Sequence, residues 1–256
     1  MDVPVLYETN DGVGVITLNN PEKSNPLSLE VLRGLVDAFR ESAAGGDVCV
    51  IYRAEGKNFT FGADLKHGYR LITDPELKNE AVADLWTWQE LTTAMLDHPG
   101  VIIVGYHGWI VGGGFEHTLA ADLRVAADDT KIMMPELDLG IFYSNASTMI
   151  LPRIVGEGRA RELMLLGEVV KAQAALEMGL VCRVCPRGEL DSVMREYAGK
   201  LASKDRYALR TAKRVLNAAR QGTLEDALYR EGRAMIDTGK SGGPEARIGA
   251  FLKMNK

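Results

Sequence analysis

Short apolar runs recur along the first half of the chain, separated by longer segments in which apolar and polar residues alternate at other spacings. The runs are rich in β-branched residues, which is typical of buried strands. They are GVGVITLNN at residues 12–20, VCVIYRA at 48–54, VIIVGY at 101–106, ADLRVAA at 121–127 and TKIMMPEL at 130–137, the last ending as a strand at Pro135.

The segments between these runs carry apolar residues at helical spacing. Residues 28–44 read SLEVLRGLVDAFRESAA, with Ser28 in the N-cap position, and a longer mixed stretch covers residues 75–97. Serine is a preferred N-cap because its side chain accepts a hydrogen bond from a free amide of the first turn. Strands that alternate with helices predict an α/β core with a largely parallel sheet.

The pattern becomes helical after about residue 159. Four segments have helical periodicity, at residues 159–168, 171–180, 189–203 and 207–221. We therefore predict a core with the functional site at residues 1–200 and a trailing helical region at residues 201–256. No segment between them resembles a flexible linker.

Composition and charge exclude several classes of function. The chain has 256 residues, of which 46% are hydrophobic and 25% charged, and its net charge is −5. Nucleic acids and anionic membranes normally bind proteins with a basic excess, so neither is an expected partner. The apolar runs are shorter than the roughly 18 to 20 residues that span a bilayer, and no signal-like apolar region follows Met1.

The three cysteines, Cys49, Cys182 and Cys185, are too few for a disulfide framework, which fits the reducing cytoplasm. The CRVC spacing lacks the second ligand pair that a zinc site needs. We interpret it as two thiols in or near a strand and predict no metal site.

Three consecutive glycines, Gly112, Gly113 and Gly114, stand between an apolar run and the start of a predicted helix in the segment WIVGGGFE. Amides at a helix N-terminus have no partner within the helix and stabilise negative charge. The alternative is that the glycines only allow tight packing or a sharp turn. The spacing does not match the G-x-G-x-x-G pattern of dinucleotide sites.

A second segment, FTFGADL at residues 59–65, places Gly62 and Ala63 at a predicted turn after a strand. Its amides could face the same point as those of the triple glycine. Two amides that converge on one oxygen form an oxyanion hole, which would hold the enolate of a thioester. Asp64 is interpreted as a turn or cap carboxylate.

Two carboxylates lie close to these segments in the sequence. Glu116 follows the glycines, and Glu136 follows Pro135 at the end of an apolar run. Carboxylates in apolar surroundings are costly unless they are paired, hydrogen-bonded or functional. Together they could activate a water and protonate a carbon, whereas each taken by itself is interpreted as a cap or a surface residue.

With these segments in view, the chain resembles the crotonase, or enoyl-CoA hydratase/isomerase, superfamily. The resemblance runs through GVGVITLNNPEKSNPLS, FTFGADL, HGWIVGGGFEHTLAADLRVAA, PELDLGIF and GEVVKAQAALEMGLVCRV. It implies an α/β fold of repeated ββα units forming two roughly perpendicular sheets, with a helical C-terminal trimerisation region. It also implies an acyl-CoA substrate, no prosthetic group, and a homotrimer or homohexamer.

The resemblance assigns roles residue by residue. It places the oxyanion donors at the backbone N–H groups of Ala63 and Gly113, and the two hydratase glutamates at Glu116 and Glu136. Both glutamates are present, which favours addition of water to a 2-enoyl-CoA. Isomerases of the family work with the glutamate at the Glu136 position alone, so Δ3,Δ2-isomerisation stays open, as do decarboxylation and thioester hydrolysis.

The resemblance also predicts which residues line the substrate site. The expected lining residues are Lys23, Ser24, Leu27, Gly62, Asp64, Leu65, Gly112, Tyr143, Ser144, Asn145, Phe251 and Lys253. Lys253 or Lys256 could reach a coenzyme A phosphate in a neighbouring subunit, and the alternative is that both lysines are only solvated at the surface. The segment IFYSNAS at 141–147 departs from the glycine-rich loop of similar hydratases. It makes simple straight-chain acyl groups doubtful, and Tyr143 is read either as pocket wall or as a substrate hydrogen-bond donor.

An acid at the Ser144 position, which dienoyl isomerases and hydroxyisobutyryl hydrolases of the family use, is absent. His107, His117, Trp86 and Trp88 are interpreted as packing or wall residues. A non-catalytic acyl-CoA-binding module is the alternative from another functional class. The sequence does not identify the acyl group.

Overall fold

Two β-sheets organise the protein in a computed structural model that describes residues 3–220 and 222–254. The larger sheet has the strand order β1-β2-β3-β4-β6-β9, and only its first pair, β1 with β2, is antiparallel. Its strands are β1 Val5–Asn10, β2 Val13–Leu18, β3 Cys49–Ala54, β4 Val101–Tyr106, β6 Leu123–Ala127 and β9 Arg183–Cys185. The smaller sheet has the order β5-β7-β8, with β5 Trp109–Val111, β7 Lys131–Met133 and β8 Val170–Lys171.

The inner strands of the larger sheet are buried on both faces, to which successive side chains point in turn. In β3, Val50 and Tyr52 join the main core together with Phe39 of helix α1 (Leu29–Gly45). Ile51 points the other way and packs in a second cluster with Met194 of helix α8 (Leu190–Ala202). This two-sided burial explains why the strands read as continuous apolar runs.

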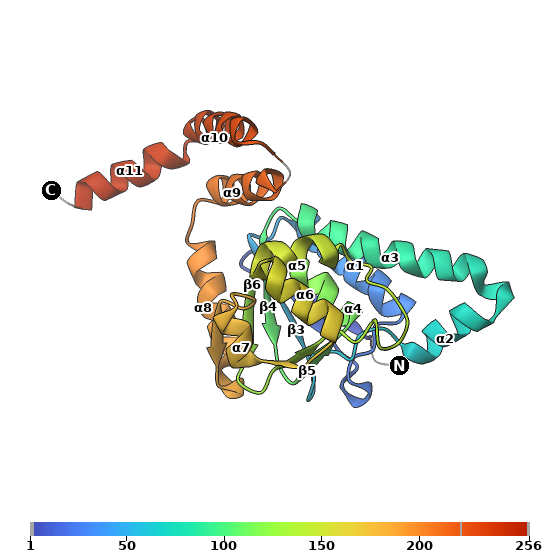
Figure 1. Ribbon diagram of the computed structural model, residues 1–256. Coiled ribbons are helices and arrows are strands. Elements are labelled where there is room, and N and C mark those ends of the chain that lie inside the picture. Colours follow the sequence, from blue (N-terminus) through green and yellow to red (C-terminus); the bar gives the residue numbers. More distant parts are fainter. Residues whose placement is uncertain (1–2, 221, 255–256) are drawn as a thin grey trace.

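Helix α1 begins and ends as its sequence predicts. The Ser28 side chain accepts a hydrogen bond from the Val31 amide at 3.4 Å, and Gly46 ends the helix with a φ of 79°. A left-handed C-cap of this kind favours glycine. The long helix α3 (Lys78–Asp97) packs against α1 on the same side of the sheet (Figure 1).

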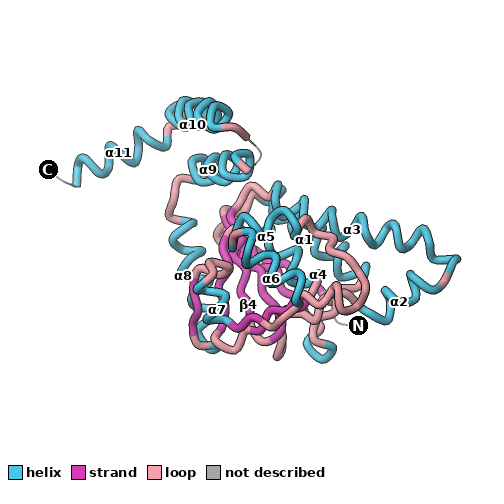
Figure 2. Tube along the Cα trace, in the orientation of Figure 1, coloured by secondary structure: helices cyan, strands magenta, loops and turns pink. Residues whose placement is uncertain are grey.

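The remaining helices lie around this core. They are α2 Leu65–Thr73, α4 Gly113–Glu116, α5 Ser147–Val155, α6 Glu157–Leu166, α7 Ala172–Glu177, α9 Arg206–Ala219, α10 Leu224–Gly239 and α11 Gly243–Met254, with short 3₁₀ turns at Pro21–Lys23, Pro75–Leu77, His117–Ala120 and Arg187–Glu189. Helices α9 to α11 form an arm that extends from the sheets, as Figure 1 and Figure 2 show. None of the described helices combines the length and apolar character that crossing a bilayer requires.

The predicted α/β class and the five predicted strands are confirmed, and Cys185 lies in a strand as expected, with all three thiols free. The helix expected after the glycines was wrong in length, because α4 makes one turn before a 3₁₀ turn replaces it. The strand directly before the glycines is β5, in the smaller sheet, and not residues 101–106. The predicted helical segment that ends at Gln221 has its last residue outside the described residues.

Candidate active site

The loop at residues 59–65 and the triple-glycine segment meet in direct backbone contact. A Cβ atom on Gly62 would lie 2.5 Å from the Val111 carbonyl oxygen, and one on Gly114 would lie 3.0 Å from the Gly62 Cα atom. Gly62 also has a φ of 81°, which side chains rarely allow. The glycines are therefore required for the two loops to approach each other. They serve the close packing of the loops, and Gly62 also serves the turn.

The orientation of two peptide groups at this contact follows from the hydrogen bonds of their carbonyls. The Gly62 carbonyl accepts from the Leu27 amide at 2.8 Å, and the Gly112 carbonyl accepts from the Phe115 and Glu116 amides at 2.7 and 2.9 Å. In a planar trans peptide the N–H points opposite to the C=O. The N–H groups of Ala63 and Gly113 therefore point away from these partners, and within the described chain neither donates to another protein group.

Glu116 ends the single turn of α4 and is held by donors from the start of α5. Its side chain is buried, and its Oε2 accepts from the Ser147 hydroxyl at 2.6 Å and from the Ser144 amide at 3.1 Å. The Asn145 amide lies 3.5 Å from the same oxygen. These donors fix the position and orientation of the Glu116 carboxyl group.

Glu136 has the opposite environment. It is equally buried, but its Oε2 has no hydrogen-bond partner among the described residues. Burial, followed by repulsion from Glu116, raises the pKa of Glu136 to about 8. A Cβ atom on Gly112 would lie 2.8 Å from Glu136 Oε1, so the carboxyl group sits against the glycine segment.

The segment that departs from the expected glycine-rich loop is held by hydrogen bonds within the protein. The Tyr143 hydroxyl donates to the Met164 carbonyl, which favours the wall interpretation over a substrate hydrogen bond. Asn145 is fully buried, and its amide group bonds the Thr92 and Ser144 hydroxyls at 3.0 Å each. Ser144 thus contacts Glu116 through its backbone amide, and it contacts Asn145 through its side-chain hydroxyl.

The segment expected to line the coenzyme A site lies beside the loop at residues 59–65. Leu27 pairs with Ala63 in an isolated bridge, and the Ser24 carbonyl accepts from the Phe61 amide at 3.1 Å. Lys23 is exposed just before this contact. Asp64 is the N-cap of α2, as its cap interpretation predicted, since its side chain accepts from the Lys66 and His67 amides.

Leu65 is exposed in the first turn of α2. Phe251 and Lys253 lie on α11, where both are exposed, at the far end of the C-terminal arm (Figure 1). The structure does not bring these two residues to the glutamates of the same chain. Lys256 lies outside the described residues.

The histidines and tryptophans near the glycines support the site without reaching its carboxylates. His117 is fully buried, bonds the Gly113 carbonyl and the Tyr52 hydroxyl at 2.9 and 3.1 Å, and has its pKa lowered to about 4 by burial. His107 is also buried, with a pKa lowered to about 4 mainly by burial. Trp88 packs against Gly113, where a Cβ atom would lie 3.0 Å from its ring, and Trp86 is exposed.

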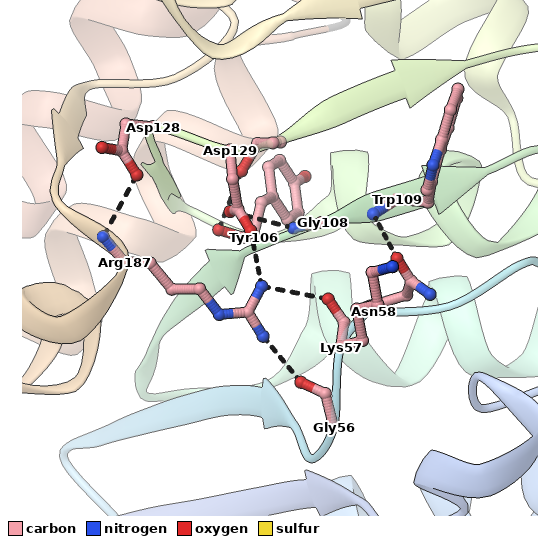
Figure 3. Close-up of polar contacts among 10 residues, drawn as sticks. Gly56, Lys57, Asn58, Tyr106, Gly108, Trp109, Asp128, Asp129 and Arg187 are labelled. Atoms are coloured by element: carbon pink, nitrogen blue, oxygen red, sulfur yellow. Dashed lines mark hydrogen bonds and ion pairs between the residues drawn. The ribbon is translucent and has the colours of Figure 1, made fainter.

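Sequence reasoning missed several residues that hold the loop preceding Ala63. Figure 3 shows Arg187, whose guanidinium group donates to the carbonyls of Gly56 and Lys57 at 2.6 and 3.0 Å and to the Asp129 carboxylate at 2.6 Å. Its own amide donates to Asp128. These partners are about 60 to 130 positions away in sequence, so no local pattern marks them. Ser147, Thr60 and Asn25 were missed for the same reason.

The site contains carboxylates and backbone amides but no evident metal-binding cluster. Within residues 3–220 and 222–254, no group of three or more histidine, cysteine, aspartate or glutamate side chains is placed to hold a metal ion. Backbone amides with no partner among the described residues can stabilise a negative oxygen, and carboxyl groups can transfer protons.

Known proteins resemble the chain over nearly its whole length. The family model of enoyl-CoA hydratase/isomerase matches residues 8–252. The chain is 31% identical to the hydroxycinnamoyl-CoA hydratase-lyase of Pseudomonas fluorescens, covering 97% of this chain and 91% of that protein. It is 28% identical to the short-chain-enoyl-CoA hydratase of Clostridium acetobutylicum, covering 98% and 95%. The crystal structure of an enoyl-CoA hydratase from Bacillus anthracis superposes with a TM-score of 0.91 at 29% identity, covering 98% of this chain and 96% of that one.

Proposed function

The chain belongs to the enoyl-CoA hydratase/isomerase family, and we propose that it is a lyase that adds water to the double bond of a 2-enoyl-CoA thioester, or removes it in reverse. The observation that carries the proposal is the pair of buried carboxyl groups in unequal environments. Glu116 accepts hydrogen bonds from Ser147 and Ser144, whereas Glu136 Oε2 has no described partner beside the glycine segment. The pair can therefore supply a base and an acid at once.

The proposed reaction proceeds through an enolate. The thioester carbonyl oxygen binds between the N–H groups of Ala63 and Gly113, which stabilise the negative charge that develops on it. The Glu116 carboxylate accepts a proton from a water molecule while the oxygen of that water bonds to C3 of the substrate. The electrons of the C2–C3 double bond move onto the thioester carbonyl oxygen. The enolate then collapses, and C2 takes the proton from the Glu136 carboxyl group.

The first test measures hydration of purified protein against a panel of 2-enoyl-CoA thioesters, followed by loss of the conjugated-enoyl absorbance. We expect Glu116→Gln and Glu136→Gln each to lower kcat by about 10²- to 10⁴-fold, because each removes one proton-transfer group. Binding of a saturated acyl-CoA should change only a few-fold. Glu30→Gln, on the exposed side of α1, is the matched control and should retain wild-type turnover.

Wild-type rates in either glutamine variant would remove that residue from the mechanism. Tight binding of acyl-CoA by a wild-type protein that converts no thioester would instead favour a non-catalytic binding module. Release of carbon dioxide or of free coenzyme A would assign the same enolate site to decarboxylation or hydrolysis.

A Δ3,Δ2-enoyl-CoA isomerase is the second candidate, favoured by the Oε2 of Glu136, which has no partner in the described part of the chain. One carboxylate that removes a proton from C2 and returns it to C4 is enough for that reaction. With a 3-enoyl-CoA as substrate, an isomerase would raise the conjugated-enoyl absorbance. It would also tolerate Glu116→Gln while losing activity in Glu136→Gln, which separates it from the hydratase.

The substrate contacts are proposed by similarity and by position. The segment with Lys23, Ser24 and Leu27 borders the Ala63 loop, so it is placed to line the coenzyme A moiety together with nearby backbone. That nearby set comprises Gly62, Asp64, Leu65 and Gly112, while Tyr143, Ser144 and Asn145 form the wall beside the carboxylates. We place Phe251 and Lys253 in the site of a neighbouring copy.

A homotrimer or homohexamer is proposed on the same basis. Helices α10 and α11 expose large apolar side chains, among them Leu228, Met235 and Ile248, on an arm that extends from the core (Figure 2). The division into residues 1–200 and 201–256 and the cytoplasmic location stay predictions of the sequence.

A further inference from the structure

Thr60 lies between the two loops of the candidate oxyanion hole and contacts both. Its side chain is fully buried. The hydroxyl donates to the Asn25 carbonyl at 2.5 Å and accepts from the Gly62 amide at 3.0 Å. Its methyl group faces Gly114 so closely that a Cβ atom on that glycine would collide with it. One side chain therefore touches the loop of Ala63 with its hydroxyl and the loop of Gly113 with its methyl group.

The backbone of Thr60 adds two further connections. Its amide donates to the Trp109 carbonyl and its carbonyl accepts from the Val111 amide, each at 3.2 Å. These bonds join the loop to β5, which leads directly into the glycines. Each backbone and hydroxyl group of Thr60 is thus engaged, and together they link three segments that are far apart in sequence.

Asn25 fixes the third of these segments. It has a φ of 51°, a left-handed conformation that asparagine tolerates better than most residues. Its buried side-chain amide donates to the carbonyls of Glu55, Asn58 and Phe59 at 2.9, 3.1 and 3.0 Å. The carbonyl that receives the Thr60 hydroxyl is therefore itself held in place, so the hydroxyl has a rigid acceptor.

The geometry of the Gly62–Ala63 peptide depends on this hydroxyl. The Gly62 amide is bound to Thr60 and the Gly62 carbonyl to Leu27, so both sides of Gly62 are fixed. The next N–H along the chain is that of Ala63, one of the two proposed donors. We propose that Thr60 is a positioning residue that sets the spacing and direction of the Ala63 N–H relative to the Gly113 N–H; this inference rests on the proposed function.

Two substitutions separate the hydroxyl from the methyl group. Thr60→Val keeps the shape and the methyl contact with Gly114 but leaves the Gly62 amide and the Asn25 carbonyl without their partner. Buried groups that lose a partner seek another, which would turn the Gly62–Ala63 peptide. Thr60→Ser keeps both hydrogen bonds and loses only the methyl group. Thr17→Val, in strand β2 and outside these loops, is the matched control for replacing a buried threonine.

The experiment measures kcat and KM with the best 2-enoyl-CoA, and in parallel the fraction of bound 3-ketobutyryl-CoA present as its enolate, read from the enolate absorbance. A donor misplaced by about 1 Å can cost up to 10²-fold in rate. We expect Thr60→Val to lower kcat at least tenfold and to reduce the bound enolate, with KM changed less than threefold. Thr60→Ser should retain most of the wild-type kcat and of the bound enolate, and Thr17→Val should leave kcat and the bound enolate unchanged.

Thr60→Val with wild-type kcat and wild-type enolate fraction would overturn the inference. So would losses in Thr60→Val and Thr60→Ser that follow their melting temperatures alone, because such a pattern describes a purely structural residue. A wild-type protein that hydrates no thioester but stabilises the bound enolate would refute the proposed reaction while the Thr60 comparison still decides the inference. A wild-type protein that does neither would refute both.

Discussion

The two glutamates of the site differ because of their neighbours and not because of their own chemistry. One oxygen of Glu116 accepts hydrogen bonds from a hydroxyl and a backbone amide. Burial, followed by the charge of Glu116, raises the pKa of Glu136. Two carboxyl groups in environments as different as these can divide the roles of base and acid. At neutral pH the proposed acid, Glu136, still carries its proton.

The pH dependence of turnover follows from this assignment. With a pKa of about 8, Glu136 loses its proton as the pH rises through that value, and the proposed hydration loses its acid. We expect kcat/KM for hydration to be level near neutrality and to fall about tenfold per pH unit well above pH 8, because kcat/KM reports the groups of the free enzyme. A profile of kcat/KM between pH 6 and about 10 measures this. A level profile throughout would contradict the role of Glu136 as acid.

Protein stability gives an independent check of the same group. Between its ordinary value of 4.5 and about 8, Glu136 binds more protons in the folded protein than in the unfolded chain. The contribution of Glu136 to the free energy of unfolding therefore falls as the pH rises through this interval. Glu136→Gln cannot titrate, so its urea-unfolding free energy should lack this fall. Profiles of unfolding free energy against pH that run parallel in the variant and the wild type would show that the pKa of Glu136 is not raised.

At the scale of elements, a buried ion pair fastens the C-terminal arm to the core. Lys213 of α9 lies 2.7 Å from Asp122 and donates to the Gly100 carbonyl at 2.8 Å, next to the start of β4. Burial lowers the pKa of Lys213, and the nearby charge of Asp122 opposes that effect. The same Asp122 accepts from the Ile102 amide at 2.8 Å. Helix α9 is thus tied to the start of β4.

Removing one member of this pair should be far worse than removing both. Lys213→Met leaves the Asp122 carboxylate partly buried without its counter-charge, so we expect a loss of about 3 to 5 kcal/mol in unfolding free energy. The double variant Lys213→Met/Asp122→Asn should lose clearly less than Lys213→Met alone. Urea denaturation of the three proteins gives both values. Equal losses of unfolding free energy in the single and double variants would mean that the effect of Lys213→Met does not come from an uncompensated charge on Asp122.

The sequence predicted those elements whose pattern is local and failed where an element depends on distant partners. The buried runs and the Ser28 cap could be read directly, and so could the carboxylates beside the glycines. Strand β1 is mostly exposed and lacks a continuous apolar run, and β5 is only three residues long. Thr60 and Asn25 are polar residues whose roles depend on a hydrogen bond between residues 35 positions apart in the sequence. No spacing rule reveals such contacts.

At the scale of the whole molecule, the arm and the site point to more than one copy. Leu224, Leu228 and Met235 lie within one stripe of α10, since they follow helical spacing, and each is strongly exposed. An exposed stripe of this kind marks an interaction surface. Lys253, on α11, is separated from the glutamates of its own chain by the length of the arm (Figure 1). An assembly would bury the stripe and could bring Lys253 to a second copy's site.

The last prediction tests the arm and the site together. Leu228→Glu/Met235→Glu places two charges in the α10 stripe, so sedimentation should change from trimer or hexamer to monomer while the circular dichroism stays native. Arg230→Glu, on the opposite face of α10, should leave the assembly intact. If Lys253 of one copy binds a phosphate in another, the monomeric variant should raise KM for a coenzyme A thioester but not for the matching pantetheine thioester. An equal rise for both substrates would place the coenzyme's phosphate contacts within a single chain.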